Sequence, residues 1–302
     1  MPYPSPITYP SRLLYPGTTE REFNLSPIAV GDLVLNAIDE NGSRWIVQKF
    51  DGWGSPASTA VFTQRARGHG STASEAFYTD RVMVLEGLIL TESPELLSAA
   101  LDLLNASVTL EQFTMIVSET GYIRHVLAQR QGEIIVTRLN NRQARFSFQV
   151  VAKDPRKFGD LITVSTRLPS SSGGRTYPDT YPLTYSGVTE TGVVRLTNAG
   201  NEQAPVWLRV DGPVPAGGWT VTHVGKKQAL TFASSLSLTS GEFVTVDMDR
   251  REVLAQGQAA RAGYVTSRGW FSLDPGDNDI AFSAANYSAT AQLTVTTKPA
   301  WS

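Results

Sequence analysis

The sequence predicts a mainly β protein of two domains: a first β domain with one packed α-helix, and a second domain that is an antiparallel β-sandwich. Short alternating apolar runs recur along the chain, and one segment has apolar residues at helical spacing. A stretch rich in Pro, Ser and Gly separates the runs into two groups. At 302 residues the chain exceeds the usual size of one domain. We expect domains at 1–166 and 188–302, with a linker at 167–187.

Composition narrows the class of protein. Hydrophobic residues make up 41% and charged residues 18%, which is typical of a folded chain. The 26 Lys and Arg against 28 Asp and Glu form no long run of one sign, so we do not expect recognition of nucleic acid. Cysteine is absent, which excludes disulfides and thiolate metal sites.

The first residues, MPYPSPITYPSRLLYPG, carry five prolines and no continuous apolar stretch. Each proline fixes φ and disfavours helix at the residue before it, so we expect an extended arm and neither a signal peptide nor a membrane anchor. Short strands are expected next at 33–38 and 45–50, separated by a turn at Glu40, Asn41 and Gly42.

Residues 51–80 break the strand pattern. The segment is rich in Gly, Ser, Thr, Ala and Arg and has few apolar anchors, as in RARGHGSTASEAF. A loop of this length inside a domain is usually functional, so we expect an assembly arm. It is followed by RVMVLEGLIL at 81–90, apolar at both alternating positions, which predicts a central strand covered on both faces.

One helix is predicted at 94–106. Ser93 can cap it, Pro94 suits its first position and Glu95 complements its positive end. Apolar residues then recur at helical spacing and would pack on the sheet: Leu97, Leu101, Leu104 and Val108, widened by Leu96, Ala100 and Leu103.

The remaining periodic runs predict strands. The first domain continues with strands at 113–117, 133–139 and 144–151. Many short strands with intervening turns and no helix signal predict the sandwich of the second domain. Its strands are expected at 193–197, 206–210, 219–224, 236–238, 243–247, 270–273, 280–282 and 291–296.

No residue pattern in the chain predicts a catalytic or metal site. His69, His125 and His223 are far apart and form no spaced pair of ligands; we expect His69 to face solvent and the other two to be surface or half-buried. Asp247 and Asp249 would share a strand face as paired carboxylates do, but the arginines that follow favour a charged turn.

Two further patterns are weaker. Gly52 and Gly54 begin a phosphate-loop spacing, but Ala57 takes the third glycine position, and no serine lies in a G-x-S-x-G turn. Three tryptophans, Trp207, Trp219 and Trp270, could form a sugar-stacking platform, although tryptophan in alternating strands is more often core. We therefore assign no catalytic, cofactor-binding or metal residue and expect no cofactor.

Several segments resemble the distal tail protein family of siphophage-type bacteriophages, which have long non-contractile tails. In the first domain the order RVMVLEGLIL, SPELLSAALDLL, FSFQVVAKDPRKFG is similar to that family, and DPRKFG is the most specific part. In the second domain LTNAGNEQAPVWLRVDGP, FVTVDMDRREVL and RGWFSLDPGDNDIAF are similar in order and spacing. These motifs are strand ends and turns, so they identify no catalytic residue.

The resemblance implies a non-enzymatic structural protein of the virion tail tip. Its first domain would be tail-tube-like and close a hexameric ring, its second a galectin-like sandwich, and its partners would be further copies, the tail tube protein and the tail-tip or baseplate hub protein. The arm at 51–80 would pair with a neighbouring subunit, with the proline-rich start as second candidate. The alternative is a carbohydrate-binding virion protein that contacts a host surface glycan through the second domain. A glycan-hydrolysing enzyme ranks third.

Overall fold

The computed structural model of the protein describes residues 26–172 and 188–302 and divides into two units. The first unit ends at Phe158 and the second begins at Gly159. This division precedes the predicted boundary at 166, because β13 (Ile162–Arg167) pairs along its length with β25 (Gln292–Thr297) of the second unit. The proline-rich start lies outside the described residues.

The predicted linker at 167–187 lies within the second unit. Arg167 ends β13, and β14 (Ser170–Ser172) pairs with β15 (Val188–Glu190) in a two-stranded antiparallel ladder. Residues 173–187, which make up most of the predicted linker, are outside the described residues.

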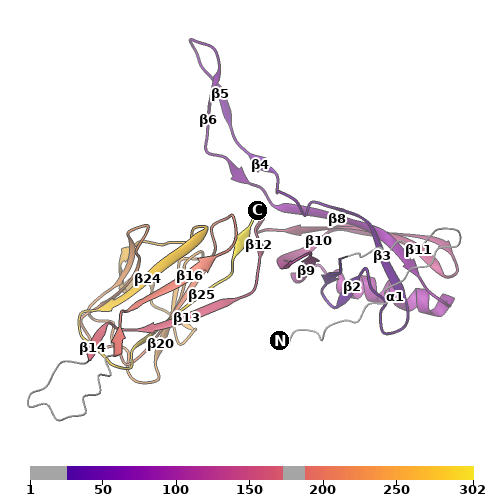
Figure 1. Cartoon of the computed structure of the whole chain (residues 1–302). Helices are drawn as coiled ribbons and strands as arrows, with labels where there is room; N and C mark the ends of the chain where they lie inside the picture. The colour runs from indigo at the N-terminus through magenta and orange to yellow at the C-terminus, as the bar shows by residue number, and fades with distance from the viewer. Residues whose placement is uncertain (1–25, 173–187) are drawn as a thin grey trace, which may run out of the picture. The chain divides into compact units, whose positions relative to one another are not determined.

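The first unit is built on one antiparallel sheet with the strand order β2-β1-β9-β10-β11-β8-β3, and β12 (Lys157–Phe158) pairs with β10 (Figure 1). The strands of this path are β1 (Ile28–Val30), β2 (Leu33–Leu35), β3 (Arg44–Asp51), β8 (Arg81–Leu90), β9 (Phe113–Glu119), β10 (Tyr122–Asn140) and β11 (Gln143–Ala152).

The two ends of this sheet come together at β2 and β3. Asn36 Oδ1 accepts a hydrogen bond from Val47 N at 2.8 Å, and Ala37 O accepts one from Trp45 N at 2.9 Å. Asn36 adopts a positive φ of 60°, which ends β2 before the predicted strand limit at residue 38. The edge strands therefore satisfy each other, and the sheet curls toward a barrel.

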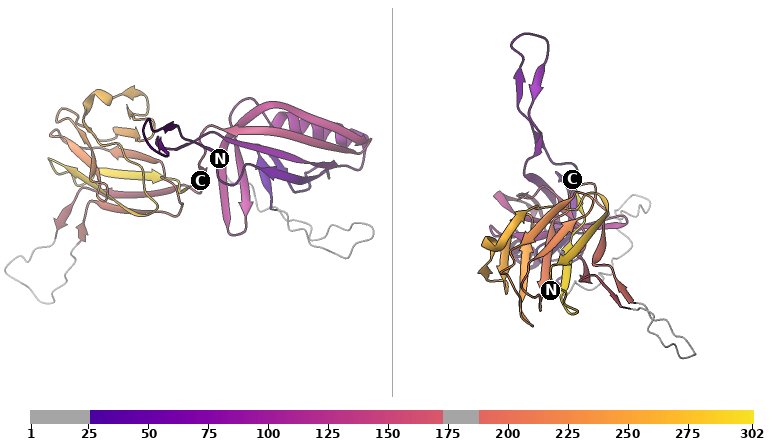
Figure 2. Two further views of the ribbon diagram at one scale, coloured as in Figure 1. Left: turned by 90° about the horizontal axis from the view of Figure 1, so that it is seen from above. Right: turned by 90° about the vertical axis from the view of Figure 1, so that its left-hand side faces the viewer.

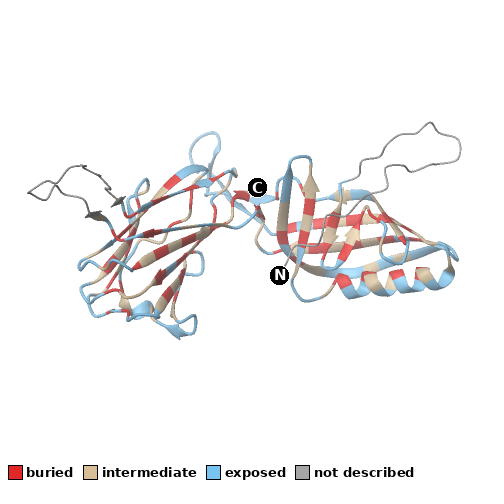
Figure 3. Cartoon of the chain, turned by 60° about the horizontal axis from the view of Figure 1, so that its bottom comes forward, coloured by how far each residue is buried: buried red, intermediate tan, exposed pale blue. Residues whose placement is uncertain are grey.

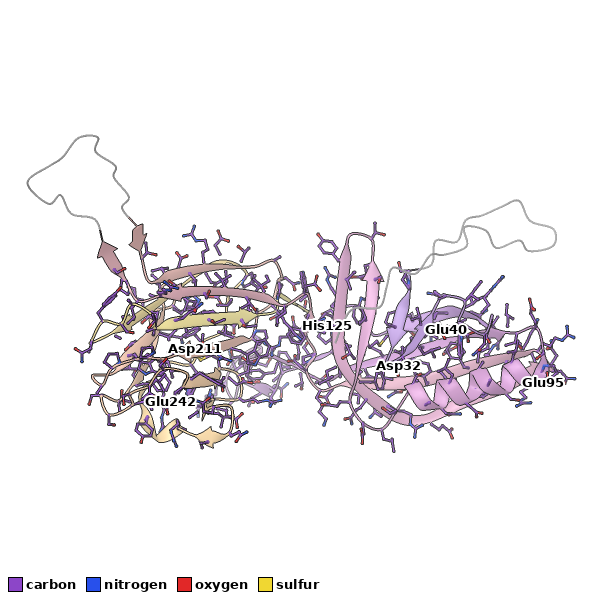
Figure 4. All side chains as sticks on the ribbon, turned by 90° about the horizontal axis from the view of Figure 1, so that it is seen from below. Asp32, Glu40, Glu95, His125, Asp211 and Glu242 are labelled. Carbon is purple, nitrogen blue, oxygen red and sulfur yellow. The ribbon has the colours of Figure 1, made fainter. Side chains whose placement is uncertain are left out.

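The predicted helix is confirmed as α1 (Pro94–Ser107). Ser93 is its N-cap, and its hydroxyl accepts a hydrogen bond from Leu96 N at 3.3 Å. Leu97 and Leu104 are fully buried, so the apolar stripe packs on the sheet as predicted. Figure 3 shows this buried side of the helix in red, and Figure 4 labels Glu95 in its first turn.

Strand β8 occupies the predicted residues and pairs with β11 on one edge and β3 on the other. The prediction that both its faces are covered is wrong. Met83, Leu85 and Ile89 are fully buried in the core, whereas Val82 on the opposite face is 44% exposed. The other residues of that opposite face are half-buried, so only the face of Met83 is fully covered by the core.

The second unit is a sandwich of two antiparallel sheets. The first sheet has the order β13-β25-β17-β20-β21-β22 and the second the order β16-β24-β18-β19-β23. The strands not yet given are β16 (Val193–Asn198), β17 (Val206–Asp211), β18 (Trp219–His223), β19 (Gln228–Phe232), β20 (Phe243–Asp247), β21 (Glu252–Ala255), β22 (Ala259–Ala260), β23 (Val265–Arg268), β24 (Gly276–Ala284) and, after β25, β26 (Ala300–Trp301); a 3₁₀ turn, η1, spans Ala262–Tyr264.

The inward-facing residues of the two sheets form the core of the sandwich, with Trp219 stacked on Phe232 at 3.8 Å between ring centres (Figure 3). The strands predicted at 236–238 and 270–273 are wrong, because only single bridges form there, from Leu238 to Val214 and from Leu273 to Ala204. The predicted fold class is confirmed: the described residues are mainly β, with one α-helix in the first unit.

Candidate functional site

The segment between β3 and β8 forms a long hairpin that leaves the sheet of the first unit. Within it β4 (Ser58–Thr59) pairs with β7 (Phe77–Tyr78), and β5 (Phe62–Gln64) pairs with β6 (Ser71–Ala73). Figures 1 and 2 show it extending away from the rest of its unit in every view in which it is seen from the side. We call residues 58–78 the arm hairpin.

The arm hairpin exposes large apolar side chains. Phe62 is 69% exposed, Val61 68%, Phe77 63% and Tyr78 43%. A two-stranded ribbon on its own is at best marginally stable in water, and an unpaired strand edge readily accepts another chain. These features point to a surface that becomes covered in an assembly.

Arg81, at the start of β8, holds the base of the hairpin. Its side chain is 1% exposed and donates to four main-chain carbonyls: Nη1 to Gly52 at 2.9 Å, to Trp53 at 3.0 Å and to Gly54 at 2.5 Å, and Nε to Pro155 at 2.8 Å. A guanidinium can satisfy several carbonyls at once because its donors are fixed in a plane. The chain entering the hairpin is thus tied to the strand leaving it.

Trp53 is the centre of this base. Lys157 Nζ donates to its main-chain oxygen at 3.1 Å, and its indole nitrogen donates to Glu119 Oε1 at 3.0 Å. Glu119 in turn forms an ion pair with Arg124 at 2.9 Å. The base of the arm therefore connects β12, β9 and β10 of the same unit through buried and part-buried polar contacts.

The electrostatics of this base are unbalanced toward positive charge. Burial, followed by the charges of Arg81 and Arg124, lowers the pKa of Lys157 to about 8, and only Glu119 opposes the shift. Burial also lowers the pKa of Arg81. The cluster binds carbonyl oxygens of the arm base, which accept hydrogen bonds from cations without adding a negative charge.

The glycines that begin a phosphate-loop spacing have a different use. The carbonyls of Gly52 and Gly54 face the Arg81 guanidinium, and Gly52 has a φ of +86° that favours glycine. A phosphate site would need main-chain N–H groups in that position. The geometry thus explains these glycines by the turn into the arm.

The three histidines are not brought together. His69 is exposed at the end of the arm hairpin, and His125 lies half-buried in β10 beside Phe158. His223 is 3% exposed, which corrects the predicted surface or half-buried position, and its Nε2 lies 3.0 Å from Asn278 Oδ1. Across 26–172 and 188–302, no group of three His, Asp or Glu residues is placed to hold a metal ion.

Asp247 ends β20, and Asp249 lies in the turn that follows. Asp247 Oδ1 accepts from Arg250 N at 2.9 Å, as in the charged turn favoured from the sequence. Of the tryptophans, Trp219 is 1% exposed in the core, Trp270 is half-buried, and Trp207 lies on the solvent face of its sheet.

Sequence reasoning singled out the arm but missed what anchors it. In the sequence, Arg81 is simply the first residue of an apolar strand, and Lys157 looks like an ordinary charged residue of a turn. The available signal was the motif DPRKFG, in which Pro155 and Lys157 supply two of the contacts to the base. No helix in the described ranges is long and apolar enough to cross a membrane.

Residues 199–301 match the family model described as the C-terminal domain of the siphovirus-type tail component. The crystal structure of the Dit protein of phage SPP1, described as a paradigm of the hub adsorption apparatus in phages that infect Gram-positive bacteria, is 10% identical with a TM-score of 0.63, covering 91% of this chain and 98% of that one. A chain of the phage p2 baseplate, in its activated conformation with Sr, is 11% identical with a TM-score of 0.46, covering 90% and 97%. No curated protein matches the chain.

These findings confirm the resemblance to distal tail proteins that the sequence motifs indicate. The family model covers most of the second unit, and the likeness to SPP1 Dit shows a shared fold over nearly the whole chain.

Proposed function

We propose that this chain is a structural protein at the distal end of a siphophage-type tail, where six copies close a ring that joins the tail tube to the tail-tip or baseplate hub. The family match of residues 199–301 supports a place in the tail tip, and the fold shared with a hub protein supports the joining role. The observation that carries the ring is the arm hairpin, which projects from the first unit with exposed aromatic side chains.

In this ring the first unit acts as a tail-tube-like domain, and its arm hairpin lies on the next subunit. Contact with a neighbour removes Phe62 and Phe77 from water and supplies partners for the open edges of the ribbon. Because the arm hairpin meets a different surface of its neighbour, the contact is head-to-tail. Such contacts form a closed ring or an open filament, and the ring is the form proposed here. The anchored base keeps the hairpin extended before assembly, which lowers the entropy lost on binding.

We infer that the second unit is a galectin-like sandwich that the ring carries. Its role in this proposal is structural, and so is that of the first unit. A carbohydrate-binding role is the second candidate function, because Trp207 lies on an open sheet face beside a groove.

The mass of the intact protein in solution tests the ring. We expect native mass spectrometry to find hexamers of the full chain, and monomers of a Phe62→Ser, Phe77→Ser variant. Val224→Ser, Tyr287→Ser is the matched control: these residues are 47% and 57% exposed and belong to the second unit, so hexamers should remain.

Two results would contradict the proposal. A full chain that stays monomeric at high concentration, both alone and with the tail tube protein, would exclude the ring. A variant in which residues 58–78 are replaced by a short Gly-Ser turn, yet which still forms hexamers, would exclude the arm hairpin as the connecting element.

A further inference from the structure

The solvent face of the first sandwich sheet carries a groove of about 240 Å³. Four of its lining residues form one row across neighbouring strands, in the order Thr296, Trp207, Asp247, Glu252. A second row beside it contains Arg209, Thr245 and Leu254. Residues directly opposite on adjacent strands stand about 5 Å apart, so these side chains surround one small space.

The groove exists because two side chains of the second row leave its centre open. Arg209 is drawn along its own strand toward Asp211, which it contacts at 2.7 Å, and its guanidinium lies 3.9 Å from the ring centre of Phe243. Thr245, between Arg209 and Leu254, is too short to fill the space. A hollow remains between the Trp207 indole on one side and Glu252 with Leu254 on the other.

Trp207 is held in a fixed position at this hollow. Its indole nitrogen donates to Asp247 Oδ2 at 3.0 Å, while Asp247 Oδ1 accepts from Arg250 N at 2.9 Å. The side chain of Asp247 is 20% exposed. Arg250 Nε also lies 3.8 Å from Oδ2, so Oδ1 is the oxygen with a lone pair to offer a ligand. The ring is therefore already ordered, which reduces the entropy that a ligand loses on binding.

We propose that this groove binds a single neutral pyranose ring of a surface glycan, an inference that rests on the second candidate function and not on the hexameric ring. The C–H face of a pyranose is apolar and would lie on the indole of Trp207 and on Leu254, which are its matching surfaces. Sugar hydroxyls would donate to the carboxylates of Asp247 and Glu252 and exchange hydrogen bonds with Thr245 at the floor.

Charge selects among sugars. The two carboxylates of the lining repel an anionic ligand. Arg209, the cation of the lining, is already paired with Asp211, and Arg250, 3.8 Å from Asp247, is 79% exposed, so solvent screens its charge. Acidic sugars and phosphate groups are therefore disfavoured. The size of the groove is below that of a typical drug-sized pocket, which limits it to about one ring and to weak binding of the free sugar.

The test follows the indole N–H signals of the full chain by NMR during titration with methyl glycosides of glucose, galactose, mannose and N-acetylglucosamine. We expect the Trp207 signal, assigned with Trp207→Phe, to shift with at least one of them. The signal of Trp219, which is buried in the core, should stay in place. Methyl glucuronide should bind at least about tenfold more weakly than its neutral counterpart.

Two substitutions on solvent faces form a matched pair. Thr245→Arg fills the hollow and should weaken binding at least about tenfold, whereas Thr222→Arg on β18 of the opposite sheet should leave it unchanged. Should Thr245→Arg fail to fold, the exposed Glu252→Gln replaces it, with binding several-fold weaker. The proposal is overturned if the Trp207 signal does not shift with any of the four neutral sugars. It is also overturned if both Thr245→Arg and Glu252→Gln leave binding unchanged, or if the glucuronide binds as tightly as the neutral sugar. None of these measurements depends on whether the chain forms the hexameric ring.

Discussion

Lys157 Nζ lies 3.1 Å from the main-chain oxygen of Trp53 and 5.4 Å from the centre of its indole ring. The lysine belongs to β12, and the tryptophan begins the segment that leads into the arm hairpin. Arg81 Nη1 donates to the same carbonyl at 3.0 Å, so the arm is held by two cations from two different strands. The stability of the arm base is therefore tied to that of the first unit.

Replacing Arg81 should have a large effect on stability. Arg81→Ala removes the side-chain donor of the Gly52, Gly54 and Pro155 carbonyls, whereas Trp53 O keeps Lys157, so we expect the free energy of unfolding to fall by about 3 kcal/mol. Urea unfolding of the full chain, followed by tryptophan fluorescence, measures this. Lys49→Ala is the control, because its ion pairs with Asp51 and Glu86 are exposed and their loss should leave the free energy of unfolding nearly unchanged. Equal losses in both variants would contradict the anchoring role.

Lys157 should make the first unit more stable in mild alkali. Burial, then the charges of Arg81 and Arg124, lowers its pKa to about 8 from the ordinary 10.5, so between these values the unfolded chain binds more protons than the folded one. The contribution of Lys157 to the free energy of unfolding therefore rises with pH from about 8 to 10.5. Below pH of about 8 the lysine is charged in both states, and the full cost of burying its charge remains.

Compared with Lys157→Met, which has no such group, the native chain should gain free energy of unfolding between pH of about 8 and 10, by at most about 3 kcal/mol. Denaturant unfolding of both proteins at several pH values gives this difference, in which the titration of all other groups cancels. Parallel curves for the two proteins would show that Lys157 is not a buried cation in solution.

Local patterns in the sequence predicted the elements that depend on near neighbours. The helix after Ser93 follows from capping and from apolar residues at helical spacing, and β8 follows from ten residues between two breaks in the pattern. The closure of the sheet could not be predicted, because it rests on Asn36, whose side chain replaces a strand partner for Val47. Nothing in the neighbourhood of an asparagine reveals such a distant contact.

In the candidate site, too, features set by neighbouring residues could be predicted and features set by distant contacts could not. The arm was visible as a long segment without apolar anchors, and its exposed Phe62 and Phe77 stand within that segment. Its anchor joins residues that are 74 and 104 positions apart, as from Arg81 to Pro155 and from Lys157 to Trp53. Single charged residues next to apolar strands are ordinarily solvated, so their burial became apparent only in three dimensions.

Gly87 in β8 should not tolerate a side chain. A Cβ there would overlap the main-chain oxygen of Ile46 and the ring of Phe146 in the core. We expect Gly87→Ala to lower the free energy of unfolding by about 1 to 3 kcal/mol. Gly54→Ala provides the comparison, since a Cβ at Gly54 has open space around it and no such loss is expected. Thermal unfolding of the two variants separates these outcomes, and an unaffected Gly87→Ala would mean that β3 and β11 are less closely packed there.

The start of α1 offers the last test, through two serines on the same helix. Ser93→Ala removes the hydroxyl that accepts from Leu96 N, and we expect a loss of about 1 kcal/mol because one N–H of the first turn loses its partner. Ser98→Ala removes a hydroxyl that bonds to Pro94 O within the helix, where alanine has the higher helix propensity, so stability should stay constant or rise slightly. Urea unfolding of both variants measures the difference. Since α1 covers the core of the first unit through Leu97 and Leu104, a cap that matters for the helix should matter for the whole unit, and equal stabilities of the two variants would show that packing alone fixes this end.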